Sequence, residues 1–287
     1  MFLVALLSLQ LHTGAQQIDR KLQKKVAQLI AGFKGDVGLY IKSLKTGKFV
    51  ALNADTVFPT ASMVKIPILL GIIHKIQTKE LAYHQKLFYK DSLLYQGEDI
   101  LGSFKNNETI ELSKVLMLML TTSDNTASLW LQSIAGTGTR INKILDSLGF
   151  KATRVNSKTP GREASRNLYG WGQTTPKEMA NLFVAIYNKK MFGYEGSTKM
   201  MRLLGRNYWD EEGLSQIPPT VEVFSKNGAV NASRSEVFLV NAPHHPYVVC
   251  IITKNNKDQS WSETNEAWVL TKKLSALLWQ YFEPKMK

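Results

Sequence analysis

The chain has 287 residues, 44% of them apolar, and a formal net charge of +13. This length and apolar content are enough for one large domain or a domain with two lobes. The excess of Lys and Arg does not indicate nucleic acid binding, because the sequence has no zinc finger, no RNA-binding aromatic signature and no clear recognition helix. The single cysteine, Cys250, excludes an internal disulfide, and its surroundings, YVVCIIT, indicate a buried strand residue.

The N-terminus has the features of an export signal. Residues 2–9, FLVALLSL, are apolar, and small residues follow at 13–15. The apolar run is too short to span a bilayer, so we expect a signal peptide over residues 1–15 and no stable membrane insertion. The alternative is a buried N-terminal strand. Export without disulfides suits a protein that is secreted or periplasmic in a bacterium.

Hydrophobic spacing predicts helices and strands along the rest of the chain. In chain order the predicted elements are a helix at 17–33, strands at 36–44 and 48–55, helices at 62–76, 112–121, 125–136, 139–148 and 175–187, strands at 220–226, 235–241 and 246–253, and a closing helix at 262–282.

Strands at both ends of this order, with helices between them, predict a mixed α/β (α+β) fold. Short links between sequential strands favour an antiparallel sheet built from both chain ends and flanked by helices, with an all-helical lobe inserted. We place the sheet lobe at about 17–55 and 206–287 and the helical lobe at about 56–205. Because no linker separates them, we expect residues 16–287 to form a single catalytic domain, monomeric, with a cleft between the lobes.

The stretch PTASMVK, residues 59–65, contains the first candidate catalytic pair. Positions three apart on a helix share a face, so Ser62 and Lys65 point the same way. Burial disfavours the charged form of a lysine, and a neutral amine beside a serine can activate it as a nucleophile. The alternative is an ordinary helix start with Lys65 in solvent.

A second polar motif, TTSDNTA at 121–127, lies at a break between two apolar helices. Buried polar groups need partners, so Ser123, Asp124 and Asn125 together are costly unless they serve a site. A second hydroxyl and an amide beside a nucleophile suit proton relay and substrate binding. Capping of the following helix by Ser123 or Asp124 is the alternative.

Two further motifs combine glycine with polar side chains. In SKNGAV, at the end of a strand, Gly228 permits close approach of a ligand and Lys226 supplies charge for a carboxylate, with Asn227 between them. The loop PGREASRNLYGWGQTTP, at 160–176, offers Glu163 and Asn167 as groups that hold a water. An earlier Lys-Thr-Gly at 45–47 falls in a predicted hairpin turn, so we do not assign it to the site.

Taken in this order, Ser-x-x-Lys, Ser-Asp-Asn, Glu-x-x-x-Asn and Lys-x-Gly form a specific set, and the chain resembles the class A serine β-lactamases. The resemblance implies that Ser62 is the acylated nucleophile and that Lys65 accepts or relays its proton. It also implies that Ser123 passes a proton to the lactam nitrogen, that Asn125 binds the side-chain amide of a β-lactam substrate, and that Lys226 attracts its carboxylate.

The same resemblance implies groups for the oxyanion and for the deacylating water. The backbone N–H groups of Ser62 and Ala229 are expected to form an oxyanion hole. Glu163 and Asn167 are expected to hold the water that releases the product. No cofactor is implied, and we expect no metal, because no suitable ligand spacing exists.

Several positions depart from the family pattern. Position 227 is Asn where the family usually has a hydroxyl, so the substrate carboxylate loses one partner. The loop after Asn167 looks about three residues shorter than usual, and Gly161 and Gln173 stand where an Arg–Asp pair commonly clamps it. Arg234, in NASRSEV, is a candidate for carboxylate binding beside Lys226, and an outward-facing strand residue is the alternative.

Two other functions share most of these motifs. A penicillin-binding D,D-peptidase-like serine hydrolase has the first three motifs without a positioned deacylating Glu. A β-lactam sensor domain is acylated and stays acylated. The behaviour of Glu163 distinguishes both from a β-lactamase that confers antibiotic resistance.

Overall fold

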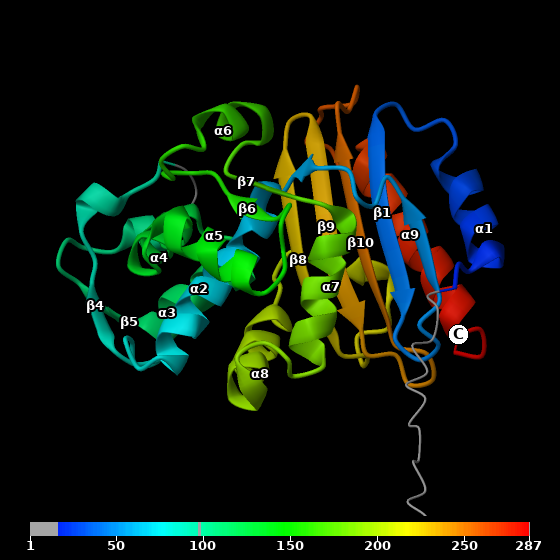
Figure 1. The fold of residues 1–287 in the computed structure, drawn as a ribbon. Helices are drawn as coiled ribbons and strands as arrows, with labels where there is room; N and C mark the ends of the chain where they lie inside the picture. The colour runs from blue at the N-terminus through cyan, green and yellow to red at the C-terminus, as the bar shows by residue number, and fades with distance from the viewer. Residues whose placement is uncertain (1–16, 97–98, 287) are drawn as a thin grey trace, which may run out of the picture.

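The computed structural model describes residues 17–96 and 99–286, and the predicted signal segment lies outside them. A five-stranded antiparallel sheet forms one side of the molecule, in the order β2-β1-β10-β9-β8 (Figure 1). Its strands are β1 (Asp36–Ser43), β2 (Phe49–Leu52), β8 (Val223–Val230), β9 (Ser233–Val240) and β10 (Tyr247–Lys254). The prediction that both chain ends build one antiparallel sheet is therefore confirmed.

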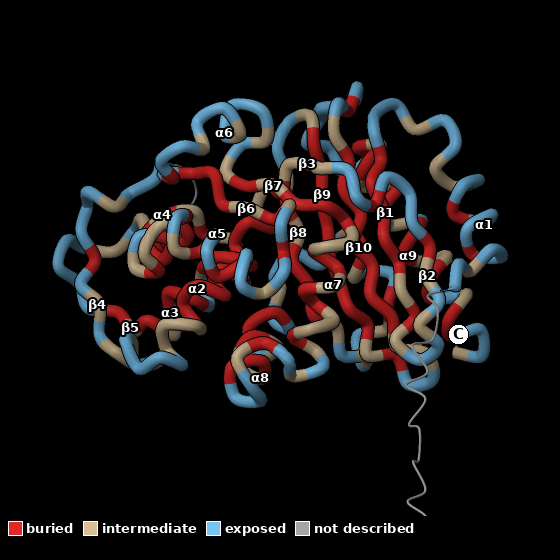
Figure 2. Tube along the Cα trace, in the orientation of Figure 1, coloured by how far each residue is buried: buried red, intermediate tan, exposed pale blue. Residues whose placement is uncertain are grey.

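Helices cover both faces of this sheet. Helices α1 (Arg20–Ile30) and α9 (Glu266–Phe282) pack on one face, and α7 (Pro176–Tyr187) packs on the other against β1, β9 and β10. Strand β10 lies at the centre and is buried on both faces, which explains its continuous apolar sequence (Figure 2). Cys250 is part of this strand, and burial raises the pKa of its thiol well above the usual range.

The middle of the chain forms a mostly helical region beside the sheet (Figure 1). Its centre is α2 (Lys65–Gln77), preceded by a 3₁₀ turn (Ala61–Val64); every residue from 65 to 73 is buried. A helix that is apolar on all sides packs on all sides, and α2 contacts three neighbouring helices. Further predicted helices of this region are α3 (Leu112–Met117, continued by a π turn, Leu118–Thr122), α4 (Asn125–Ile134) and α5 (Thr137–Ser147).

Some elements were not predicted from the sequence. They are α6 (Glu163–Tyr169), α8 (Gly193–Leu204), three 3₁₀ turns (Asp91–Leu93, Leu101–Ser103 and Leu214–Gln216), a small sheet of β3 (Phe58–Pro59), β7 (Gly172–Thr174) and β6 (Arg154–Val155), and the pair β4 (Lys86–Phe88) and β5 (Thr109–Glu111). The inserted region therefore contains short strands as well as helices. One of its helices, α7, packs against the five-stranded sheet. The domain boundaries given above remain a prediction.

One local motif of the sequence lies where it was expected. The Lys-Thr-Gly at 45–47 lies in the turn between β1 and β2, as predicted. Within residues 17–96 and 99–286, no helix has the length and apolar character needed to cross a membrane.

Candidate active site

Ser62 lies in the 3₁₀ turn that leads into α2, at the wall of a cavity of about 640 Å³. The residue before it, Ala61, has a φ of +44°, which is unfavourable for a side chain with a Cβ. Such strain persists only where the surroundings impose it, and it is common at functional sites. The turn thus presents the Ser62 hydroxyl at the N-terminal end of a buried helix.

Lys65 is fully buried, and its ammonium nitrogen is surrounded by oxygen atoms. Lys65 Nζ lies 3.1 Å from Ser62 Oγ, 3.0 Å from Ser123 Oγ and 2.8 Å from Asn125 Oδ1, and it also donates to the backbone carbonyl of Ser123. Burial lowers the pKa of Lys65 to about 7, although the nearby carboxylates of Asp99 and Asp124 pull it upward. A large fraction of Lys65 is therefore neutral at neutral pH, as a base for Ser62 requires.

Ser123 reaches Lys65 because the backbone changes direction at this residue. The π turn after α3 ends at Ser123, which has a left-handed φ of +63°. Asp124 then caps α4: its Oδ1 accepts from Ala127 N at 2.7 Å and its Oδ2 accepts from Leu101 N at 2.8 Å. Both interpretations of the motif, a helix cap and a functional site, are therefore partly correct. Asp124 caps α4, and Ser123 and Asn125 contact Lys65.

Asp99 is a site residue that the sequence analysis missed. Its carboxylate accepts from Asn125 N at 3.0 Å, from Thr126 N at 2.7 Å and from Thr126 Oγ1 at 2.9 Å, so it fixes the first turn of α4. No local pattern predicts this contact, because 26 positions separate Asp99 from Asn125. Its negative charge also stabilises the charged form of Lys65.

Strand β8 forms the edge of the sheet and passes directly behind the nucleophile. A Cβ at Gly228 would lie 2.6 Å from Ser62 N, so only glycine allows this approach. Ala229 follows and lines the cavity together with Ser62. The oxyanion hole formed by the N–H groups of Ser62 and Ala229 remains a prediction.

Lys226 lies deeper in the same strand and is completely buried. Burial, and secondarily the charge of Lys65, lowers the pKa of Lys226 well below the usual range. Lys226 Nζ donates to Asn227 O at 2.9 Å and to Asn227 Oδ1 at 3.1 Å. The Asn227 side chain thus serves as an acceptor for Lys226, and neither residue lines the cavity.

Arg234 does not occupy the predicted place beside Lys226. Its side chain leaves β9 on the side of α9, where its guanidinium carbon lies 4.6 Å from the ring centroids of both Trp261 and Trp268. It donates to the carbonyl oxygens of Val230, Asn231, Ser233 and Ser260. The next residue along β9, by contrast, donates to Thr60 O on the side of the site. Because successive strand residues point to opposite faces of a sheet, Arg234 points away from the site. Its hydrogen bonds instead stabilise the β8–β9 turn.

Glu163 and Asn167 are not brought to the nucleophile either. Both are exposed residues of α6, and neither lines the cavity. Glu163 Oε1 accepts from Gly161 N at 3.1 Å, so the carboxylate folds back onto the start of its own helix. The part of the loop that lines the cavity is instead 168–171. The expectation of a loop without secondary structure was wrong, and a seven-residue helix orients these side chains.

A different clamp holds this loop. Arg162 donates to Asn156 Oδ1 from Nε at 3.0 Å and to Gln173 Oε1 from Nη2 at 2.7 Å, and it thereby links both ends of the loop. A clamp at Gln173 was not predicted, because the usual partner of an arginine at this position is a carboxylate. An amide oxygen accepts from a guanidinium as well, although without the ionic attraction.

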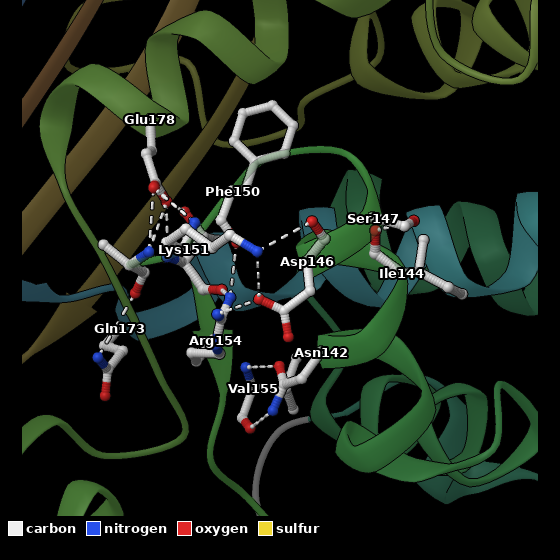
Figure 3. Close-up of polar contacts among 12 residues, drawn as sticks. Asn142, Ile144, Asp146, Ser147, Phe150, Lys151, Arg154, Val155, Gln173 and Glu178 are labelled. Atoms are coloured by element: carbon white, nitrogen blue, oxygen red, sulfur yellow. Dashed lines mark hydrogen bonds and ion pairs between the residues drawn. The ribbon is translucent and has the colours of Figure 1, made fainter.

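Figure 3 shows how residues 151–155, which precede the loop, are anchored to α5 and α7. Glu178, in the first turn of α7, accepts from the backbone N–H groups of residues 151–153 at 2.8, 3.0 and 2.7 Å. Asn142 on α5 donates to Val155 O at 3.0 Å and accepts from Val155 N at 2.8 Å. The loop therefore begins from a backbone that is hydrogen-bonded to both helices.

Comparisons with known proteins identify the family to which this chain belongs. The model of the β-lactamase enzyme family matches residues 21–282. The chain belongs to this family. It is 22% identical over 277 residues to the β-lactamase VEB-1 of Pseudomonas aeruginosa, covering 91% of this chain and 90% of VEB-1.

Solved structures of this fold agree closely with the described chain. PBP-A has a TM-score of 0.82 at 21% identity and covers 94% of this chain and 98% of its own, and a point mutant of PBP-A, solved as an acyl-enzyme complex with penicillin G, matches equally well. A class A β-lactamase from Bacteroides cellulosilyticus has a TM-score of 0.81 at 18% identity, with 92% and 98% covered. At these identities the structures establish the fold, and the family match identifies the chain as a β-lactamase-type hydrolase.

Side chains that bind metals do not gather anywhere in the described part of the chain. No group of three or more His, Cys, Asp or Glu residues has a suitable arrangement among residues 17–96 and 99–286. The two adjacent histidines, His244 and His245, donate their backbone N–H groups to Glu283 Oε1 at 2.8 and 2.9 Å. They hold the end of α9 against the sheet.

Proposed function

We propose that the protein opens the β-lactam ring of penicillin- and cephalosporin-type compounds through an acyl-enzyme on Ser62. The observation that carries this proposal is the buried amine of Lys65, which lies within hydrogen-bond distance of both Ser62 Oγ and Ser123 Oγ. This arrangement connects a nucleophile, a base and a second hydroxyl in one chain of hydrogen bonds. These three groups support acylation of Ser62 by a cyclic amide.

In the proposed acylation, neutral Lys65 takes the proton of Ser62 while Ser62 Oγ bonds to the lactam carbonyl carbon. The developing negative charge on the carbonyl oxygen is stabilised by the backbone N–H groups of Ser62 and Ala229. When the carbon–nitrogen bond breaks, Ser123 donates its proton to the ring nitrogen and recovers one from protonated Lys65. By the family motif, Lys226 is the expected partner of the substrate carboxylate, whose negative charge would favour the protonated form of Lys226 that burial disfavours.

Hydrolysis of the resulting ester requires a water and a base. Glu163 with Asn167 is our expectation from the family motif, and reaching the ester would require α6 to reorient. Among the described residues, the titratable side chain within hydrogen-bond distance of Ser62 Oγ is Lys65. We propose that Lys65 supports deacylation when Glu163 keeps its contact with Gly161.

The position of Glu163 also favours a second candidate function. In the part of the chain that the structure describes, no carboxylate lines the cavity that contains Ser62. An enzyme with a complete acylation site and no carboxylate at the ester forms an adduct that decays slowly. This is the behaviour of a D,D-peptidase-like serine hydrolase or of a β-lactam sensor.

The test is mass spectrometry after brief exposure to benzylpenicillin, together with steady-state hydrolysis. We expect one adduct on the peptide that contains Ser62, and its loss, with a decrease in turnover of at least about 10⁴, in Ser62→Ala. Ser92→Ala is the matched control, because Ser92 is exposed and does not line the cavity. An undiminished Ser62→Ala enzyme would remove the basis of the proposal.

The lifetime of the adduct separates the two candidate functions. A short lifetime in the wild type that lengthens strongly in Glu163→Ala supports hydrolysis through Glu163. A short lifetime that is the same in both supports hydrolysis with Lys65 as base. Long, equal lifetimes support the peptidase or sensor function.

We also propose that the chain is exported through residues 1–15 and acts as a monomer on small-molecule β-lactams outside the cytoplasm. The apolar run at 2–9 supports export, and the β-lactamases among its relatives support a role in antibiotic resistance. Expression in a susceptible bacterium should raise the inhibitory concentration of penicillins. Deletion of residues 2–9 should abolish this effect while leaving the purified enzyme active.

A further inference from the structure

The cavity beside Ser62 has a mostly apolar wall that contains one lysine. Tyr95 and Trp171 line it and pack edge to face on each other, with ring centroids 5.1 Å apart, and Leu168, Tyr169 and Val230 add to the apolar lining. Within residues 17–96 and 99–286, the one charged side chain that lines the cavity is Lys254. None of the catalytic or substrate-binding roles described above involves the positive charge of Lys254.

Lys254 is the last residue of β10, and its amine has few protein partners. Lys254 Nζ donates to Val57 O at 3.3 Å and lies 4.7 Å from the ring centroid of Phe58. No described carboxylate lies within 4.0 Å of it. Asp36, its cross-strand neighbour, accepts instead from Asn255 Nδ2 at 2.7 Å. The amine therefore keeps donors for a ligand, in a partly apolar environment.

The proposed function indicates which part of a substrate enters this cavity. Lys226, the expected partner of the ring carboxylate, does not line it. Asn125, the expected partner of the side-chain amide, does line it together with Ser62. The cavity thus extends from the reacting carbonyl along the acyl side chain, with Lys254 as the cation on this path.

We propose that Lys254 binds a carboxylate carried by the acyl side chain of the substrate, so that the enzyme prefers acyl donors with an acidic side chain. This inference rests on the proposed function. A charge-assisted hydrogen bond in a half-buried site is stronger than one between neutral groups. The apolar wall limits solvent around the pair, which strengthens the attraction further. We expect the preference to be roughly tenfold to a hundredfold.

The test compares benzylpenicillin with its α-carboxy derivative, which differs by one side-chain carboxylate. For each we measure kcat/KM with the wild type, Lys254→Met, Lys254→Arg and Lys257→Met. Methionine keeps the length of the side chain without its charge, and arginine restores the charge. Lys257 is exposed and does not line the cavity, so its variant is the matched control.

We expect the ratio of kcat/KM for the carboxylated over the plain compound to fall at least about tenfold in Lys254→Met. It should recover at least partly in Lys254→Arg and stay unchanged in Lys257→Met. An unchanged ratio in Lys254→Met, or an equal fall in Lys257→Met, overturns the inference. The ratio cancels general losses of activity or folding, because both compounds meet the same protein.

A binding measurement separates this inference from the proposed function. Dissociation constants of both compounds are determined by calorimetry on Ser62→Ala and on the double variant Ser62→Ala/Lys254→Met. Suppose that the wild type hydrolyses neither compound, while Ser62→Ala still binds the carboxylated compound more tightly than the plain one and the double variant does not. In that case the proposed function fails and this inference stands. If Ser62→Ala binds both equally, or binds neither, the inference is wrong.

Discussion

If neutral Lys65 is the base for acylation, the acylation rate must follow its titration. With the ordinary lysine pKa of about 10.4, roughly one molecule in 2,500 has a neutral amine at pH 7. With the pKa of Lys65 lowered to about 7, about half of the molecules have one at that pH. Burial thus increases the population of active base about a thousandfold. The acylation rate should fall as the pH decreases through about 7, because protonation removes the base.

A change at Asp99 tests whether this acid limb belongs to Lys65. The Asp99 carboxylate raises the pKa of Lys65 against the larger, opposite effect of burial. Asp99→Asn removes this charge, so the pKa of Lys65 should decrease further and the acid limb should move to lower pH. The rate at pH values below the wild-type midpoint should therefore increase relative to the plateau. Asp91→Asn, at an exposed position, is the matched control and should leave the midpoint unchanged.

The assay is stopped-flow acylation by a chromogenic cephalosporin from about pH 5 to about pH 9, with each rate divided by its plateau value. Dividing by the plateau separates the change in pKa from any change in geometry that Asp99→Asn causes at α4. Lys65→Arg should lower the plateau at least about 10³-fold, because arginine stays protonated in this range. A profile without an acid limb, or a midpoint that is the same in wild type and Asp99→Asn, refutes the assignment of Lys65 as base.

Other predictions concern the elements around the site. Gly228→Ala should lower acylation at least about 10²-fold, because its Cβ would lie 2.6 Å from Ser62 N; a rate within threefold of wild type in the acylation assay contradicts this. Arg162→Ala should speed amide hydrogen exchange in residues 156–173, because it removes the clamp between Asn156 and Gln173. Arg166→Ala, at an exposed position, is the control and should leave exchange unchanged. Equal exchange in both variants would show that the clamp is unimportant. Arg234→Ala should lower the free energy of unfolding by about 2 kcal/mol in urea titrations, since four carbonyl groups lose a donor and two indoles lose a cation; no change would contradict the role assigned to it.

The sequence predicted the features that depend on short-range spacing. Ser62 and Lys65 share one face because they are three positions apart at the start of a helix, and the structure places Lys65 Nζ 3.1 Å from Ser62 Oγ. The strands of the sheet were predicted because their apolar runs have a length and composition typical of buried strands. Short links between sequential strands predicted one antiparallel sheet built from both chain ends, whereas the order of its strands was not predicted.

Contacts between distant segments were not predictable in this way. Asp99 stabilises the start of α4 from a separate segment, and Arg162 joins two ends of a loop. The side of the sheet on which Arg234 points depends on the register of β9, and a register error of one residue reverses it. Lys254 was overlooked because it belongs to no motif and becomes part of the cavity only when β10 takes its central place.

The two steps of the proposed reaction depend on parts of the fold with different rigidity. The acylation groups lie on buried elements, because Lys65 and Lys226 are completely enclosed and Gly228 fixes the distance between β8 and the nucleophile. The expected deacylation group, Glu163, lies on an exposed seven-residue helix with no buried residue. Substitutions in this helix therefore affect few packing contacts, whereas substitutions around Lys65 disturb the core. The lifetime of the acyl-enzyme can thus change through the loop while the acylation rate stays the same, so a hydrolase and a slowly released acyl-enzyme are separated by few changes in sequence.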